Sequence, residues 1–420
     1  MKNTFKLALR GLTRNRRRSL VTLLAIALGF AAIALFAGYT RNVFDGLQRQ
    51  SIYGEMLGHL TLSKTGMRKE GKLDPERYLL TAPEVERITA LLREEAHVDM
   101  VAPRLALSGL MSNGRASTIF IAEAIEPAAM ARFQDNILSE DEIRSGMFNN
   151  QLKQLDPERI EVVELSEGLV DILHLAVGGQ AAVLVNTLAG QANALDITVG
   201  HTFNTGNAGS NDKFAYMPLA LARSLLDAEG RADRLTILLD DAEQTLPMQA
   251  HLLKKLRDAG FDIEIQTWRD LSDFYNQVRG MFDMIFGFIF LIVLTVVIMS
   301  VANSMGMTVV ERTREIGTLR AIGLKRAGVV RLFTTESMLL TLLGCTLGLA
   351  ITVAVRWGIN LANVSYTPPN SASPVPLLIS LDVARVSFTF VLMGVVGTLA
   401  AYLPARRAAK KLIIDALGHV

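Results

Sequence analysis

Four long apolar runs interrupt an otherwise mixed sequence. A helix needs ~20 apolar residues to cross ~30 Å of hydrocarbon, and we predict transmembrane helices over residues 19–40, 281–304, 337–358 and 383–403. The first run has no charged residue from 20 to 39. It exceeds the ~7–15 apolar residues of a signal peptide, and no clear small-x-small cleavage site follows it. We therefore interpret it as an uncleaved span, and the pattern predicts a membrane α-helical protein with four transmembrane helices.

The stretch between the first two spans, residues 41–280, has the shorter periods of a globular domain. Strands are predicted where apolar and polar residues alternate, and Asn113-Gly114 between two such runs predicts a hairpin. Helices are predicted at helical apolar spacing, and Ser166 is expected to cap one of them. The predicted strands are 59–63, 105–125 as the hairpin, 180–185 and 194–199, and the predicted helices are 82–95, 167–175, 217–226 and 246–259. These elements predict a large α+β domain inserted between transmembrane helices 1 and 2.

Charge divides the chain in the same way. Residues 41–280 contain 24 Lys and Arg against 35 Asp and Glu, a net charge of −11, whereas the remainder carries +13. Lys and Arg are concentrated in residues 1–18, 305–336 and 404–420, while residues 359–382 contain neither. Because positive residues near the ends of spans stay in the cytoplasm, we expect both termini and residues 305–336 inside. The domain and the loop 359–382 are then outside.

The first eighteen residues have a pattern of their own. Every fourth residue is basic and apolar residues follow another face, with Lys2, Lys6, Arg10 and Arg14 set against Phe5, Leu9 and Leu12. This spacing predicts a cytoplasmic amphipathic helix over residues 1–18 that lies on the inner leaflet. The alternative is a basic flank that only orients the first span.

Catalytic motifs are scarce. Residues 66–72 have the Gly-x-x-x-x-Gly-Lys spacing of a phosphate-binding loop, but Leu73 stands where a Mg²⁺-binding Ser or Thr is needed. The six histidines show no metal-ligand spacing. The single cysteine, Cys345, has no partner for a disulfide in the chain. We expect no catalytic residue, no metal site, no cofactor and no nucleic-acid binding in this chain.

The segment 305–336, between the second and third spans, holds a charged helix with an apolar stripe. Its centre, residues 311–323, is E-R-T-R-E-I-G-T-L-R-A-I-G, in which Ile316, Leu319 and Ile322 recur at helical spacing. One interpretation is a surface helix that only joins two spans. The other, which we favour, is a helix that inserts its apolar stripe into a groove of a cytoplasmic partner, because this stripe is expected to face the cytosol.

This run resembles the signature of FtsX-like permeases, the membrane subunits of type VII ABC transporters such as MacB, LolC and LolE. The resemblance includes the basic N-terminal segment, V-V-E-L-S-E-G at 162–168 in a MacB-like outer domain, and P-A-R-R-A-A from Pro404. The tail at 411–417 departs from the family in lacking a proline before the final Ala-Leu. In the family this cytoplasmic helix docks on the ATPase subunit. The resemblance therefore assigns ATPase coupling to Glu311, Arg312, Arg314, Glu315, Gly317, Arg320, Ala321 and Gly323.

The resemblance also implies a set of partners. ATP and Mg²⁺ are expected on a separate, dimeric cytoplasmic ABC ATPase, because few residues precede the first span and the chain has no valid phosphate loop. A second permease subunit, identical or paralogous, is expected beside this one. Membrane lipids and a periplasmic carrier or adaptor protein complete the expected surroundings, in the bacterial inner membrane.

Three functions are consistent with these features. The leading one is a permease that uses movements of its periplasmic domain to extract or export a lipoprotein or another lipophilic cargo. The second is an FtsX-like mechanotransmitter that activates a periplasmic hydrolase without transport. The third is an extracytoplasmic ligand sensor. The size of the outer domain favours cargo handling.

Three details within the spans lead to further predictions. Apolar residues at helical spacing predict that the second span continues outward as a stalk, at Leu271, Phe274, Val278, Phe282 and Ile285. Gly344 and Gly348 have the spacing that permits close packing of a neighbouring helix. Asp283 and Arg356 lie near the outer ends of their spans, where they either pair with each other or extend separately to water.

Overall fold

The computed structural model describes residues 16–71, 73–137, 155–205, 209–367 and 375–414. The chain divides into two compact units. We call one the helical unit, which comprises Met1–Phe44, Val278–Val364 and Pro376–Val420, and the other the globular domain, which comprises Asp45–Gln277 and Ser365–Val375. Most of the amphipathic helix predicted over residues 1–18 lies outside the described residues, as do Lys72 of the phosphate-loop-like motif and the last residues of the tail.

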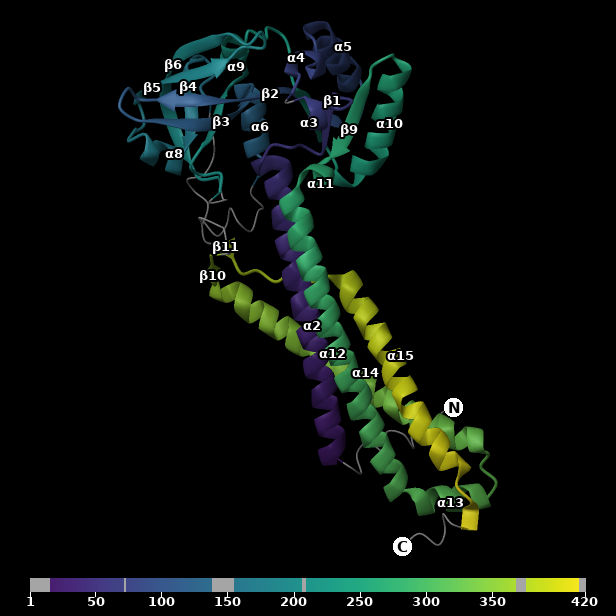
Figure 1. Cartoon of the computed structure of the whole chain (residues 1–420). Coiled ribbons are helices and arrows are strands. Elements are labelled where there is room, and N and C mark those ends of the chain that lie inside the picture. The colour runs from purple at the N-terminus through teal and green to yellow at the C-terminus, as the bar shows by residue number, and fades with distance from the viewer. Residues whose placement is uncertain (1–15, 72, 138–154, 206–208, 368–374, 415–420) are drawn as a thin grey trace. The chain divides into compact units, whose positions relative to one another are not determined.

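Four helices of the described residues have the length and composition of membrane spans. They are α2 (Arg16–Arg49), α12 (Asp273–Glu311), α14 (Arg326–Ala362) and α15 (Val383–Lys410) (Figure 1). Each contains one of the four predicted apolar runs. The prediction of a four-span membrane protein with a large inserted α+β domain is confirmed.

The second span is part of a much longer helix than the membrane requires. α12 is continuous over 39 residues and begins at Asp273, so Leu271 of the predicted stalk belongs to a separate one-turn helix, α11 (Trp268–Leu271). Ser272 separates the two helices because its backbone is not helical (φ −90°, ψ 85°). Its Oγ accepts a hydrogen bond from the Tyr275 N–H at 3.4 Å, which caps the start of α12.

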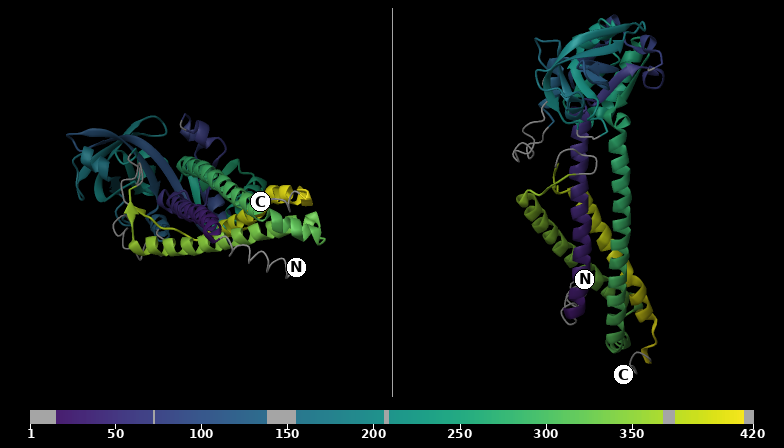
Figure 2. Two further views of the ribbon diagram at one scale, coloured as in Figure 1. Left: turned by 90° about the horizontal axis from the view of Figure 1, so that it is seen from below. Right: turned by 60° about the vertical axis from the view of Figure 1, so that its left-hand side comes forward.

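The predicted glycine surface of α14 faces α2. A Cβ on Gly344 would lie 2.7 Å from Cγ2 of Ile26, and one on Gly348 would lie 2.6 Å from the carbonyl oxygen of Ala27. Both distances are too short for real side chains, so only glycine permits this approach. Figure 2 shows α14 passing α2 obliquely. The two small residues therefore set how closely these helices pack.

The main sheet of the globular domain partly closes on itself. Among the described residues nine strands have the order β3-β7-β4-β6-β5-β2-β8-β1-β9, and β2 also pairs with β3. The extra pairing closes β2, β3, β7, β4, β6 and β5 into a barrel, in which β3–β7 and β4–β6 are parallel. The barrel strands are β2 (Val98–Ser112), β3 (Ser117–Ile125), β4 (Val162–Ser166), β5 (Gln180–Asn186), β6 (Ala192–Phe203) and β7 (Phe214–Pro218).

The remaining strands extend β2 into an open antiparallel sheet. β8 (Arg234–Leu239), β1 (Leu60–Lys64) and β9 (Ile263–Thr267) follow β2 in that order. Helices α5 (Ala82–Arg93) and α10 (Thr245–Asp258) contribute Ile88, Leu92 and Leu252 to the same buried core as Leu62 and Ile237 of this sheet. The barrel has a separate core, to which α8 (Glu167–Ile172) and α9 (Leu219–Leu226) contribute.

Short elements complete the described chain. They are η1 (Gln50–Gly54), α3 (Met67–Glu70), α4 (Pro75–Tyr78), α6 (Pro127–Gln134), η2 (Ala242–Gln244), α13 (Thr313–Ala321), β10 (Ser365–Tyr366) and β11 (Val375–Pro376). The predicted hairpin matches β2 and β3. One local prediction was wrong, because Met217 belongs to β7 and not to the following helix. Ser166 occupies the predicted N-cap position of α8, but its side chain forms no capping hydrogen bond. Its Oγ instead accepts the N–H of Phe214, because β4 and β7 are neighbours.

A buried ionic network lies where β2 changes partners. Residues of β2 up to Arg104 pair with β8, and from Leu105 they pair with β3. Arg104, only 1% exposed, donates to Glu123 on β3 at 3.0 Å and to the carbonyl oxygen of Met56 at 2.9 Å. Arg234 binds the same Glu123 and lies 2.9 Å from Asp233. The network therefore joins the barrel to the open sheet.

The two helices that lead into the globular domain end on neighbouring strands. β1 follows η1 and pairs with β9, which precedes α11, with Leu60 opposite Thr267. The hydroxyls of Ser51 and Ser272 share a buried hydrogen bond of 2.9 Å. Trp268 packs edge-on against Tyr275 with ring centroids 4.8 Å apart. The two segments by which the chain enters and leaves the domain are therefore held together at the β1–β9 pair.

Candidate coupling site

The segment predicted to couple to a partner forms a short helix between two long ones. α12 ends at Glu311, the backbone leaves helical geometry at Arg312 (φ −102°, ψ 14°), and α13 continues from Thr313 to Ala321. Gly323 then takes a φ of +103°, which favours glycine, and α14 begins at Arg326. The breaks at Arg312 and Gly323 set α13 off from both long helices.

One face of α13 packs into the helical unit. Thr313, Ile316 and Gly317 are buried. Ile316 belongs to the same apolar cluster as Val309 of α12 and Phe333 of α14. The Oγ1 of Thr313 donates to the carbonyl oxygen of Val309 at 2.9 Å, which ties the first turn of α13 to α12. α13 is thus anchored to the spans and does not extend freely into solution.

The opposite face and the end of α13 present apolar side chains to solvent. Leu319 and Leu324 are each 37% exposed and Ile322 is 77% exposed. The predicted stripe of Ile316, Leu319 and Ile322 is therefore only partly correct, because Ile316 faces the chain's own core. An α-helix turns by about 100° per residue, so Ile316, Leu319 and Ile322 do not lie directly above one another. Each lies further around the helix, from the side that faces the core to the side that faces solvent.

Arg312 faces inward. Its Nη1 donates to Glu336 of α14 at 3.1 Å, and its Nε donates to Glu315 of α13, also at 3.1 Å. Its guanidinium lies 6.0 Å from the ring centroid of Phe333. The side chain of Arg312 is 17% exposed and that of Glu336 is 3% exposed. Arg312 thus connects the bend between α12 and α13 to α14.

The other predicted coupling residues divide by exposure. Glu311 binds Arg18 of α2 across 2.8 Å, and Arg320 donates to the carbonyl oxygen of Lys411. Arg314, Ala321 and Gly323 are exposed, Glu315 is partly exposed and Gly317 is buried. The exposed members lie at the same end of the helical unit as the exposed apolar residues of α13, and Glu311 and Glu315, whose side chains are 40% and 42% exposed, are accessible there too.

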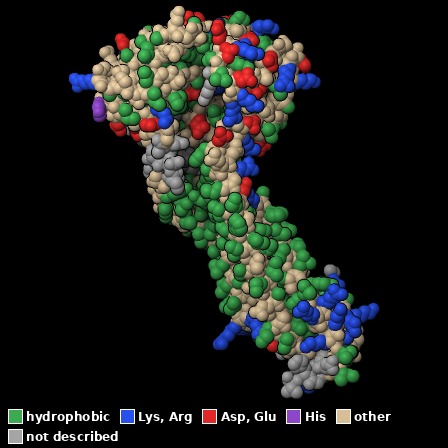
Figure 3. Space-filling view, viewed as in Figure 1, with side chains coloured by type: hydrophobic (Ala, Val, Ile, Leu, Met, Phe, Trp, Pro, Cys, Tyr) green, Lys and Arg blue, Asp and Glu red, His purple; other side chains and the backbone are tan. Residues whose placement is uncertain are grey.

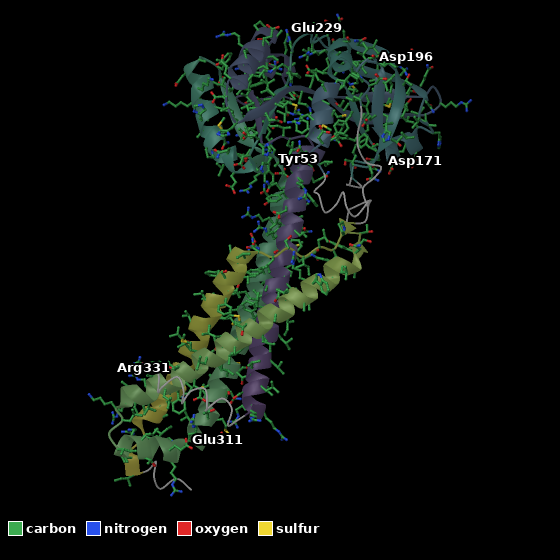
Figure 4. All side chains as sticks on the ribbon, turned by 180° about the vertical axis from the view of Figure 1, so that it is seen from behind. Tyr53, Asp171, Asp196, Glu229, Glu311 and Arg331 are labelled. Carbon is green, nitrogen blue, oxygen red and sulfur yellow. The ribbon has the colours of Figure 1, made fainter. Side chains whose placement is uncertain are left out.

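Basic residues surround this end of the helical unit. Figure 3 shows Lys and Arg gathered there, while hydrophobic side chains cover the length of the helices. Figure 4 places Glu311 of α12 and Arg331 of α14 at this same end. Exposed apolar residues within a basic rim are typical of a surface that binds another protein.

The structure does not bring Asp283 and Arg356 together. Asp283 lies 3.7 Å from Arg279, one turn earlier on α12. Arg356 donates from Nε to the carbonyl oxygen of Ile379 at 2.9 Å, which a neighbouring side chain, Asn360, also binds. A main-chain oxygen of the segment before α15 thus accepts a hydrogen bond from Arg356, and a sequence pattern does not reveal such an acceptor.

A charged group at the other end of the helical unit was missed. Asp382 accepts the N–H of Arg385 at 3.0 Å and caps α15. Arg385 lies 3.3 Å from Asp382 and donates to Thr40 of α2 at 3.4 Å, and Arg41 lies 3.6 Å from Asp382. The signal in the sequence was an acid three residues before a base at the start of an apolar run.

The known proteins that this chain matches share both of its units. A family model described as the MacB-like periplasmic core domain matches residues 19–254, more than half of the chain, and one described as the FtsX-like permease C-terminal matches residues 287–413. The chain belongs to the MacB/FtsX family of ABC transporter permeases. The MacB-like match thus covers all strands of the barrel and β8 and β1 of the open sheet, and the FtsX-like match includes the candidate coupling site.

Individual relatives are distant. The macrolide export ATP-binding/permease protein MacB of Chromobacterium violaceum is 26% identical over 99% of this chain and 60% of its own length. The pyoverdine export protein PvdT of Pseudomonas putida is 24% identical over 96% of this chain and 57% of its own. The ABC transporter permease YtrF of Bacillus subtilis is 33% identical, over 32% of this chain. The chain spans about 60% of the length of the MacB relative.

Solved structures of similar domains give weak superpositions. The periplasmic region of MacB from Actinobacillus actinomycetemcomitans matches with a TM-score of 0.33 and 15% identity, over 52% of this chain and 92% of its own. The extracellular domain of YknZ, a noncanonic ABC-type transporter from Gram-positive bacteria, matches with a TM-score of 0.33 and 12% identity, over 50% of this chain and 99% of its own.

Proposed function

We propose that this chain is a permease subunit that couples ATP hydrolysis by a separate cytoplasmic ABC ATPase to movements of its globular domain. ATP and Mg²⁺ are held by that ATPase, which acts as a dimer beneath two permease subunits, identical or paralogous. The protein resides in the bacterial inner membrane with both termini in the cytoplasm and the globular domain in the periplasm. The positive charge at the α13 end of the helical unit supports this orientation.

The ATPase docks on the exposed surface of α13. The observation that carries this assignment is Ile322, a large apolar side chain that is 77% exposed at the end of an otherwise anchored helix. Leu319 and Leu324 extend the apolar surface, and Arg314 lies on the exposed side of the same helix. A short amphipathic helix that presents apolar anchors suits a groove in a partner.

Movement then passes along α12. This helix is continuous from Asp273 to Glu311, so a displacement of α13 acts on a single rod that begins at the globular domain. The hydrogen bond between Ser51 and Ser272 supports the inference that α2 and α12 move together where they join the domain. Such movement would act on a cargo outside the membrane.

The cargo is an amphiphile, either a lipoprotein released from the outer leaflet or a smaller exported compound. Relatives named for macrolide and pyoverdine export support a transported compound. A periplasmic carrier or adaptor protein would receive such a cargo, and membrane lipids border the four spans.

The docking assignment is tested with Ile322→Asp. Burying an isoleucine contributes ~1.5–3 kcal/mol, so this variant should bind the co-expressed ATPase at least roughly tenfold more weakly. Binding is measured by titrating the purified ATPase onto the permease in nanodiscs. Leu73→Asp is the matched control, because Leu73 is 87% exposed on the globular domain. Equal binding of both variants would refute docking through α13.

A further inference from the structure

Glu336 is a buried carboxylate in the first part of α14. It is 2% exposed and lies immediately before the third predicted apolar run. An ionised group in such a place is costly unless a partner compensates its charge. The FtsX-like signature ends before this residue, and neither the coupling motif nor the predicted span assigns it a role.

The compensating charge comes from the bend of the coupling segment. Arg312 occupies the non-helical position between α12 and α13 and reaches Glu336 at 3.1 Å. Its second contact, Glu315 at 3.1 Å, lies in the first turn of α13. One guanidinium therefore fixes the orientation of α13 relative to α14, and its planar fork is suited to two acceptors at once.

The surroundings of Glu336 connect this contact to another span. The adjacent Ser337 donates to the carbonyl oxygen of Gly397 in α15 at 2.8 Å. One turn further along α14, Thr341 packs so closely on Gly397 that a Cβ there would lie 2.2 Å from its Oγ1. At the level of Glu336, α14 and α15 are thus packed together, and Arg312 holds α13 to this pair of helices.

We propose that Glu336 is a positioning residue for ATPase coupling, acting through Arg312. The pair fixes α13 to α14, so that a displacement of α13 moves α14 and α15 together with α12. Without the pair, α13 still presents Ile322 to the ATPase but swings at the Arg312 bend, and its displacement reaches α12 alone. This inference rests on the proposed function, since it presumes that an ATPase docks on α13.

The test separates docking from transmission. Glu336→Gln keeps the shape of the side chain and one acceptor oxygen but removes the charge. In nanodiscs with the ATPase, this variant should bind the ATPase with the wild-type affinity. Its stimulation of ATP hydrolysis should fall roughly tenfold, the factor that corresponds to ~1.4 kcal/mol. Ile322→Asp should show the opposite pattern, with weakened binding.

Exchanging the two charges distinguishes a positioning role of Glu336 from a contribution to folding stability alone. Glu336→Arg alone places two arginines together and should abolish stimulation, whereas the double variant Arg312→Glu/Glu336→Arg should restore at least part of it. If Glu336→Gln does not accumulate as folded protein, Arg312→Lys serves instead, because it keeps the charge and loses the fork. It should retain binding and lose stimulation in the same way.

Several results would overturn the proposal. The first is that Glu336→Gln stimulates ATP hydrolysis as strongly as the wild-type protein. The second is that Glu336→Gln loses as much ATPase binding as Ile322→Asp. The third is that the double variant Arg312→Glu/Glu336→Arg stimulates ATP hydrolysis no more than Glu336→Arg alone. Failure of the wild-type protein to bind the ATPase would instead refute the proposed function itself. The two failures are therefore distinguishable in one set of titrations.

Discussion

Two arginine–glutamate pairs, one in each unit, differ in the charged groups that surround them. Arg104 and Glu123 in the globular domain belong to a closed network with Arg234, Asp233 and the carbonyl oxygen of Met56. Arg312 and Glu336 in the helical unit have one further carboxylate, Glu315, which is partly exposed. The first pair lies within a network of charges in a domain, where the side chain of Glu123 is 20% exposed, and the second adjoins an exposed apolar surface.

The electrostatics of the closed network follow from its composition. Burial would raise the pKa of Glu123, but Arg234 and Arg104 outweigh it and hold that pKa below its ordinary value. Burial lowers the pKa of Arg104, and Glu123 opposes this effect. Each charge depends on the others, so the network suits a fixed joint between barrel and sheet. An open pair beside the proposed docking surface suits a joint that transmits movement.

The largest expected effect comes from breaking the closed network. Glu123→Gln leaves Arg104 and Arg234 beside each other without their shared anion, and should lower the free energy of unfolding of the globular domain by ~3–5 kcal/mol. Trp268 is 2% exposed in this domain, so its fluorescence in a Trp357→Phe background reports the transition. Glu336→Gln should leave this transition unchanged.

Arg132→Gln serves as the control within the same domain. Arg132 binds Asp99 at 2.8 Å, but its side chain is 51% exposed. Exposed pairs contribute little to stability, so the transition should stay near that of the parent protein. A Glu123→Gln transition that coincides with this control would remove the distinction between the closed and the open pair.

A smaller loss of stability is expected at acid pH, because of the buried neutral side chain of His59. Burial lowers the pKa of His59 from 6.5 to about 4, against the opposing effect of the carboxylates Asp241, Asp240 and Asp99. The neutral ring accepts the Leu239 N–H on Nδ1 at 3.0 Å. Between pH 6.5 and 4 the unfolded chain binds the extra proton, so stability falls as pH falls, by about 3 kcal/mol in total.

His59→Asn tests this dependence because asparagine retains an acceptor and does not titrate. Its unfolding, followed by Trp268 fluorescence, should show a shallower loss of stability between pH 6.5 and 4 than the parent. Equal slopes would mean that other groups cause the acid sensitivity. A residual slope common to both proteins would report carboxylates whose pKa the fold lowers, among them Glu84, Glu95 and Glu123.

The sequence predicted the fold unevenly, for identifiable reasons. The spans, α5, α10 and the β2–β3 hairpin follow from apolar spacing and turn residues. β4 and β8 were missed because their residues are buried on both faces, and an alternating pattern is then absent. Closure of the barrel also could not be predicted, since it depends on which distant strands pair.

The helix of the candidate coupling site was predicted in position but not in orientation. The motif located α13, and the spacing of Gly344 and Gly348 indicated a packing surface without naming α2 as its partner. Arg312 was expected on the docking surface and Ile316 on its apolar stripe, yet both face inward. Helical spacing alone does not reveal that the breaks at Arg312 and Gly323 turn α13 back onto α12 and α14.

The central claim, that the exposed surface of α13 meets a cytoplasmic ATPase, is tested most directly by labelling Ile322→Cys. The native Cys345 is buried and is replaced by alanine in the background. A membrane-impermeant thiol reagent should label residue 322 in inverted membrane vesicles, should not label it in intact cells, and should be blocked when the ATPase is added. Labelling in intact cells, or equal labelling with and without the ATPase, would contradict the account.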